Sequence, residues 1–440
     1  MDTKSKFQSR IKRIGLSLDA FSTGCLVMCL LLFVPYVSGV GSLVMWFLPL
    51  TAAVPFVVIP LVYLLIHRVD TLLFGRYHFI MPLSAFVFAP FFVMAWSASG
   101  EGALQSCLAF FGLLIFAVGI LTYRYCAFSV RARLTNAGIV EKSPQYEIFC
   151  LLGCVAAAAT YAGFLHYDSA AVYVNTAYVI GALSVLLALI QYLITYYSIP
   201  QLGGRHIIGV KRVFGEFYGG IDTCMFLSAL FFEAAYAAIA ALLVYFGFEI
   251  GIGMYATIGV ASTVIVAYAI SAFFCSRYIT RRSVRLSIIN TVCVALSAGA
   301  LVLLAALGVS GSAAEAGLIV AAAVVGMGGA VAFRQSKLRL LTVKPHLTNG
   351  IVFVLSELIM FAAAGMAFFV AAIVTAVLIA THSVTAFIYG FALAFVFAVS
   401  AFVLSSHSKY RRVQAKKNED NAMQSADDGE ADKQPETQNS

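Results

Sequence analysis

The placement of the basic residues is the feature that most restricts how this chain can fold. Long apolar runs divide the sequence of 440 residues, and the connections between them alternate between segments that hold Lys and Arg and segments that hold neither. All 28 Lys and Arg lie in the N-terminal segment, in every second connection, or in the C-terminal segment. Because basic residues accumulate in the cytoplasmic loops of membrane proteins, this pattern predicts an even number of membrane crossings with both termini in the cytoplasm.

The number of crossings follows from the lengths of the apolar runs. A membrane-spanning helix needs about 20 apolar residues, and 62% of this chain is hydrophobic while only 11% is charged. The runs are continuous rather than alternating with a period of two, which excludes a transmembrane barrel. The sequence therefore predicts an all-α, polytopic membrane protein with twelve transmembrane helices, at roughly 20–38, 43–66, 79–97, 103–123, 148–166, 172–198, 223–247, 251–275, 286–308, 316–333, 351–378 and 384–404.

The connection at 199–222 divides these spans into two groups of six. It holds Arg205, Lys211 and Arg212 between two pairs of glycines, which predicts a cytoplasmic loop between two six-helix bundles. The C-terminal segment begins with a basic cluster suited to anionic lipid headgroups and continues as an acidic, disordered tail. We expect five parts: a cytoplasmic N-terminus at 1–19, a first half at 20–198, the central loop at 199–222, a second half at 223–404 and a tail at 405–440.

The loop between the second and third predicted spans carries a short motif. It reads RVDTLLFGRYHF and contains Asp70, Gly75 and Arg76, while the equivalent loop of the second half contains Arg281 and Arg282. Together with the arrangement in two groups of six, this loop resembles the signature of the major facilitator superfamily. The resemblance implies a transporter fold in which these residues form a gate that closes the cytoplasmic side. The alternative is that the bases are only anchors on that side.

Two acidic residues lie deep in the predicted spans. By helical rise, Glu233 is about 15 Å from the cytoplasmic end of the seventh span and Glu357 is about 10 Å into the eleventh. A carboxylate there should be protonated, paired or in a wet cavity; a neutral Glu that hydrogen-bonds a neighbouring helix is the alternative. Tyr236 follows Glu233 by three residues and could hydrogen-bond it. The resemblance implies that the first, fourth, seventh and tenth spans line the central cavity, and that Glu233 faces it.

The composition of the spans restricts the solute. Their interiors hold no Lys or Arg, which an anion would need, and they offer fewer polar groups than a sugar would need. A lipophilic or cationic small molecule fits better. The sequence shows no phosphate-binding glycine motif, no nucleophile–base pattern and no metal-ligand spacing of Cys and His. We therefore expect no enzymatic activity, no cofactor, no metal and no nucleic-acid partner, and the net charge of +8 follows from the topology.

Two functions are consistent with these features. The first is a proton-coupled secondary transporter in the cell membrane, an exporter in which Glu233 exchanges its proton as the cavity alternates between the two sides. The second is a sensor or accessory protein without transport, related to the membrane portion of LuxR-type regulators. The tail at 405–440 is too short to supply a DNA-binding domain, so such a sensor would signal through a cytoplasmic protein partner at the tail.

The predicted orientation can be tested by labelling intact cells. A cysteine introduced as Arg205→Cys or Arg282→Cys should react with a membrane-impermeant maleimide only after the membrane is permeabilised, because both positions lie in predicted cytoplasmic loops. Asp168→Cys, in a predicted outer connection, is the control and should react on intact cells. Reaction of either arginine position from outside would contradict the orientation.

Overall fold

The computed structural model describes residue 18, residues 20–22, 24, 25 and 28 of the first predicted span, and residues 145–167, 172–198, 223–278, 284–307, 311–343 and 349–407. Every regular element in these residues is a helix, so the predicted all-α class is confirmed there, while the count of twelve spans extends beyond them. The elements are α7 (Gln145–Tyr167), α8 (Val172–Ser198), α10 (Thr223–Glu249), α11 (Met254–Tyr278), α12 (Val284–Ala306), α13 (Ser312–Val343), α14 (Asn349–Thr381) and the last helix, Ala386–His407.

The described helices have the lengths and compositions of membrane spans. Six candidate spans are found among them, at Ile148–His166, Thr223–Glu249, Met254–Cys275, Ser312–Arg334, Ala362–Thr381 and Ala386–His407. α8 and α12 hold shorter apolar stretches, Tyr178–Leu187 and Val292–Leu304. Since helices satisfy their own backbone hydrogen bonds in hydrocarbon, these segments support a multi-pass membrane protein.

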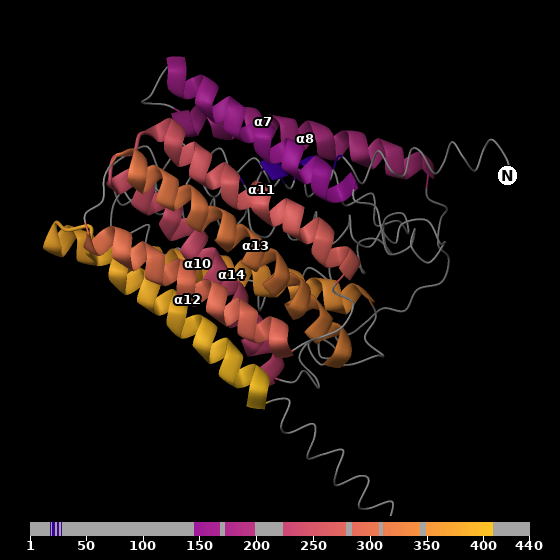
Figure 1. The fold of residues 1–440 in the computed structure, drawn as a ribbon. Coiled ribbons are helices and arrows are strands. Elements are labelled where there is room, and N and C mark those ends of the chain that lie inside the picture. Colours follow the sequence, from indigo (N-terminus) through magenta and orange to yellow (C-terminus); the bar gives the residue numbers. More distant parts are fainter. Residues whose placement is uncertain are drawn as a thin grey trace, which may run out of the picture.

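The described helices of the predicted second half form one packed group, and α7 of the predicted first half contacts it. Figure 1 shows α7 and α8 along one side, with α11 next to α7 and α13 next to α11. α13 packs in turn against α10 and α12, and α10 packs against α14. The contact between α7 and α11 joins the two predicted halves, and it includes a hydrogen bond from the Tyr161 hydroxyl to the Met254 sulfur at 3.6 Å.

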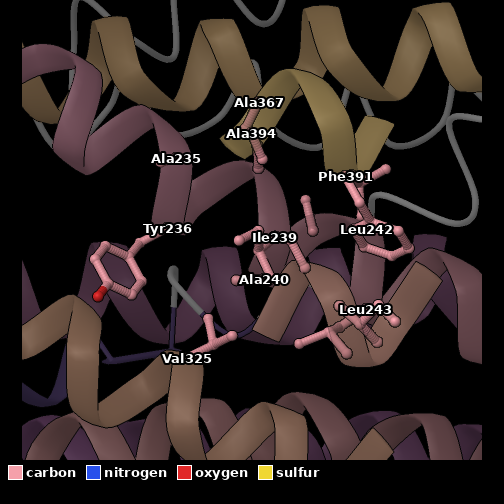
Figure 2. Packing of buried hydrophobic residues seen from close by; sticks show 14 of the residues in the cluster. Ala235, Tyr236, Ile239, Ala240, Leu242, Leu243, Val325, Ala367, Phe391 and Ala394 are labelled. Carbon is pink, nitrogen blue, oxygen red and sulfur yellow. The ribbon is translucent and has the colours of Figure 1, made fainter. Parts of the chain in front are cut away.

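α10 is the centre of the described structure. Of the residues in its apolar window, 78% are buried, compared with 28–50% in the other candidate spans. Its alanines let neighbouring helices approach closely, which is how helices associate in a bilayer. The larger residues near its C-terminal end pack with the last helix: the ring of Phe387 lies edge-on against Tyr245 and Phe246, at centroid distances of 5.0 and 5.1 Å. Figure 2 shows part of this cluster.

Short turns connect the helices at the predicted outer side. Gly251 and Gly253 join α10 to α11 with φ of 71° and 91°, a left-handed conformation that glycine adopts without strain. Between α14 and the last helix, His382 has a φ of 50° and its amide donates to the Leu378 carbonyl at 2.8 Å. The sequence predicts a turn between 378 and 384, and the structure places the break in the helix at 382–385.

α13 is longer than the sequence predicts. The predicted span ends at Phe333, whereas the helix continues to Val343 through a segment that holds Arg334, Lys337 and Arg339. Charge ends a membrane span but not a helix, because Arg, Lys, Gln and Leu all favour helical backbone. The helix ends shortly before Pro345, and the residue that precedes a proline disfavours helical geometry.

The first predicted span crosses α7 at small residues. The Cys25 thiol donates to the Gly153 carbonyl and the Cys154 thiol donates to the Gly24 carbonyl, both at 3.2 Å. A Cβ on Gly153 would collide with the Phe21 carbonyl oxygen and lie 3.0 Å from the Cys25 amide nitrogen. This reciprocal arrangement shows Cys25 and Cys154 as small packing residues.

Substitution of Gly153 should therefore separate the two helices. We expect Gly153→Ala to lower the stability of the purified protein by about 1–3 kcal/mol, the usual cost of adding a methyl group to a filled space. Gly163→Ala is the matched control on the same helix, because a Cβ there meets nothing within 4 Å. Thermal unfolding in detergent would measure both, and equal midpoints for the two variants would contradict the close crossing.

Candidate functional site

Glu233 lies in the N-terminal half of α10, where half-buried residues occur among buried ones. It is half-buried, while its neighbours Phe232 and Ala234 are buried. Phe226 and Ala237 are half-buried too, and positions 226, 230, 233 and 237 share one face of a helix with 3.6 residues per turn. Glu233 is thus only partly enclosed by the described residues, and a group that exchanges a proton needs such access.

Tyr236 lies one turn further along the same helix and is buried, with 5% of its surface exposed. Figure 2 shows its ring at the edge of the apolar cluster, with the hydroxyl directed away from Ile239 and Ala240. The ring packs against Gly328 of α13. The structure therefore places the phenol at the boundary between α10 and α13, and its predicted hydrogen bond with Glu233 stays a prediction.

The other predicted site residues lie apart from this pair or outside the described residues. Glu357 belongs to α14, whose backbone is described at that position while the side chain is not. α14 packs along α10, so two acid-bearing helices are neighbours. The predicted gate residues, Asp70, Gly75, Arg76, Arg281 and Arg282, all lie outside the described residues.

Buried hydroxyl groups tie α10 to its neighbours at two further points. Ser228 Oγ donates to the Ala401 carbonyl of the last helix at 2.8 Å. Tyr245 Oη and Thr375 Oγ1 of α14 are 3.1 Å apart, and Thr375 Oγ1 also donates to the Ala371 carbonyl at 2.9 Å. Nothing in the sequence distinguishes these residues from the other hydroxyl-bearing residues of the spans. A hydroxyl in an apolar helix suggests a bond to another helix, but one sequence does not identify its partner.

The described residues contain no group of three or more His, Cys, Asp and Glu side chains that could hold a metal ion. The chemistry that α10 offers in its apolar middle is that of the Glu233 carboxyl group with the Tyr236 phenol one turn away. A carboxyl group in a membrane span can bind a proton, donate a hydrogen bond when neutral, and attract a cation when ionised.

Comparison with known proteins agrees with the transporter fold. No protein-family model matches the sequence, and no curated protein sequence matches it. Solved structures do match. The nucleoside transporter NupG is 15% identical with a TM-score of 0.59, and the match covers 91% of this chain and 99% of NupG. A bacterial homologue of the iron transporter ferroportin, in its inward-facing state, is 14% identical with a TM-score of 0.59, over 90% of this chain and 97% of that protein.

These similarities establish the fold. The same ferroportin homologue in its outward-facing state gives a TM-score of 0.57, at 12% identity, over 90% of this chain and 98% of the other. This chain thus shares the fold of these membrane transporters. At identities of 12–15% the solutes of these proteins do not carry over.

The bond between Tyr245 and Thr375 predicts a small but specific effect on stability. Thr375→Val keeps the shape of the side chain and leaves the Tyr245 hydroxyl without this partner, so we expect a loss of about 0.6 kcal/mol, the average for interhelical hydrogen bonds in a membrane protein. Thr381→Val is the control, because the Thr381 hydroxyl is exposed and bonds only within α14, to the Val377 carbonyl. Denaturant unfolding in detergent would compare them, and equal losses would contradict the role of the interhelical bond.

Proposed function

We propose that this protein is a proton-coupled secondary transporter that exports a lipophilic or cationic small molecule across the cell membrane, with both termini in the cytoplasm. The observation that supports this function is the position of Glu233: a half-buried carboxyl group within the most buried of the described candidate membrane spans, in a chain with a transporter fold. A protein that only anchors other components has no need of an acid at that depth.

The coupling follows from the cost of charge in hydrocarbon. An ionised carboxylate near the middle of a bilayer costs a few kcal/mol unless it is solvated or paired. Glu233 would therefore carry a proton when its surroundings are closed, and release it when that face becomes wet. A cationic solute bound near the carboxylate would replace the proton as the compensating charge. Binding of one then weakens binding of the other by the same factor, since the two equilibria are linked.

The surroundings of Glu233 favour an apolar solute. Its face of α10 carries Phe226, Leu230 and Ala237, and the predicted spans contribute no Lys or Arg. A site of this kind can bury a hydrophobic ring or chain and compensate one positive charge. The cytoplasmic gate in this proposal consists of Asp70, Gly75 and Arg76 with Arg281 and Arg282, and Glu357 is a second proton-binding candidate on α14.

The second candidate function is a sensor or accessory protein that uses the transporter frame without transport. The tight packing of α10 favours it, because an immobile core suits a scaffold better than a moving carrier. Such a protein would signal through a cytoplasmic partner bound to the tail at 405–440. The two functions differ in one measurable respect, namely whether a proton gradient drives solute across the membrane.

Replacement of Glu233 tests the transport proposal. In vesicles that contain the purified protein, a proton gradient should drive a fluorescent lipophilic cation across the membrane. Glu233→Gln, which keeps the size and removes the titratable group, should reduce this flux to the level of protein-free vesicles. Glu249→Gln is the control on the same helix, since Glu249 is exposed at the outer end of α10 and should be replaceable. Undiminished flux in Glu233→Gln would remove this acid from the mechanism.

A further inference from the structure

A short segment of α13, residues 326–329 with the sequence Gly-Met-Gly-Gly, contacts two helices at once. Gly326 faces α11, where an added Cβ would collide with the Val264 carbonyl oxygen. The next carbonyl along the chain, that of Met327, accepts a hydrogen bond from Ser271 Oγ of α11 at 3.2 Å. On this side, α13 thus lies so close to α11 that no side chain fits between the two backbones.

The opposite side of the same segment receives Tyr236 of α10. Gly328 is about 200° around the helix from Gly326. A Cβ on Gly328 would collide with the Tyr236 hydroxyl oxygen and lie 2.7 Å from Cε1 and 2.8 Å from Cζ. At Gly329 an added Cβ would be 3.8 Å from Tyr236 Cβ, an ordinary van der Waals contact. The space for the phenol therefore depends on the absence of a side chain at 328 and not at 329.

The phenol and the acid belong to the same turn of α10. Tyr236 and Glu233 are three residues apart, a spacing that places side chains next to each other on a helix. The phenol is buried between the helices, while the carboxyl lies on the adjoining, half-buried face. If the ring is pushed out of its space, both the helix at this turn and the surroundings of the carboxyl have to change, because packed interiors contain few voids that could absorb the movement.

We propose that Gly328 is a positioning residue for Glu233: it provides the socket that holds the phenol of Tyr236 between α10 and α13, and thereby fixes where the Glu233 carboxyl lies. The assignment rests on the proposed function in one respect, since it gives Gly328 a role toward the same acid. Gly328 acts through the phenol and contacts neither the proton nor the solute. The glycine at 328 is then required for placement of the acid as well as for packing.

The test measures the carboxyl group itself rather than transport. Dicyclohexylcarbodiimide modifies protonated carboxyl groups in apolar surroundings, and mass spectrometry identifies the modified peptide. The full-length protein in lipid vesicles would be treated over a range of pH, and the pH at which modification of Glu233 is half-maximal would be compared among variants. Gly328→Ala should move this midpoint by about 0.5 pH unit or more, a shift within the range that local surroundings produce. Gly329→Ala should leave it unchanged.

A double substitution shows whether Gly328 acts through Tyr236. Tyr236→Ala removes the ring, so Gly328→Ala should cause no further shift in that background, whereas two independent effects would add. A full shift from Gly328→Ala without the ring, or identical midpoints for Gly328→Ala and Gly329→Ala, would overturn the proposal. If Gly328→Ala does not fold, the modification midpoint of Tyr236→Ala tests the proposal instead. An unchanged midpoint in Tyr236→Ala would then overturn it.

The two proposals can fail separately. If Glu233→Gln keeps its proton-driven flux while Gly328→Ala still shifts the modification midpoint, the transport proposal fails and the positioning role stands. If Glu233→Gln abolishes flux while Gly328→Ala leaves the midpoint unchanged, the transport proposal stands and the positioning role fails. A purely structural role of Gly328 would lower the unfolding temperature without moving the midpoint, and that result would also overturn the proposal.

Discussion

Close approach of helix backbones at glycine and alanine is the interaction on which the described structure depends. Apolar side chains are as stable in lipid as in protein, so helices in a bilayer associate through packing and hydrogen bonds rather than through removal of apolar surface from water. α10 shows the consequence most clearly, because its alanines let α11, α13, α14 and the last helix pack around it. The same principle holds at the first predicted span, where Gly24 and Gly153 let two helices cross with reciprocal thiol–carbonyl bonds.

The membrane-spanning arrangement of the second half could be predicted from the sequence because two strong physical signals coincide there. The thickness of the hydrocarbon layer sets the length of each apolar run. The preference of Lys and Arg for cytoplasmic loops predicts which connections lie on the cytoplasmic side. Helix ends outside the membrane carry neither signal. The extension of α13 from Phe333 to Val343 was therefore missed, since the polar segment that ends the span is itself a good helix former.

The candidate site also has one residue that the sequence reveals and one that it does not. Glu233 could be identified from the sequence because an acid in an apolar run is rare and costly. Gly328 could not, because it lies in a run of Gly, Ala and Val in which nothing local distinguishes it from Gly329. What separates the two glycines is the position of Tyr236, on another helix more than 90 residues earlier in the chain. A packing requirement of this kind is a property of the fold and has no signature in one sequence.

The contacts of α10 with its two main neighbours differ in kind. Toward α14 and the last helix it is interlocked: Tyr245 bonds Thr375, and a Cβ on Gly390 would lie 2.5 Å from Val374 Cγ2 and 2.8 Å from Leu242 Cδ1. Toward α13, the phenol of Tyr236 is seated against Gly328, and Leu318 and Val325 of α13 belong to the same buried cluster as α10. Interdigitated side chains resist sliding, whereas small residues permit the shear movements by which packed helices rearrange. A movement of α10 along α13 would have to displace the phenol of Tyr236 from its place against Gly328, so the turn that carries Glu233 cannot move without it.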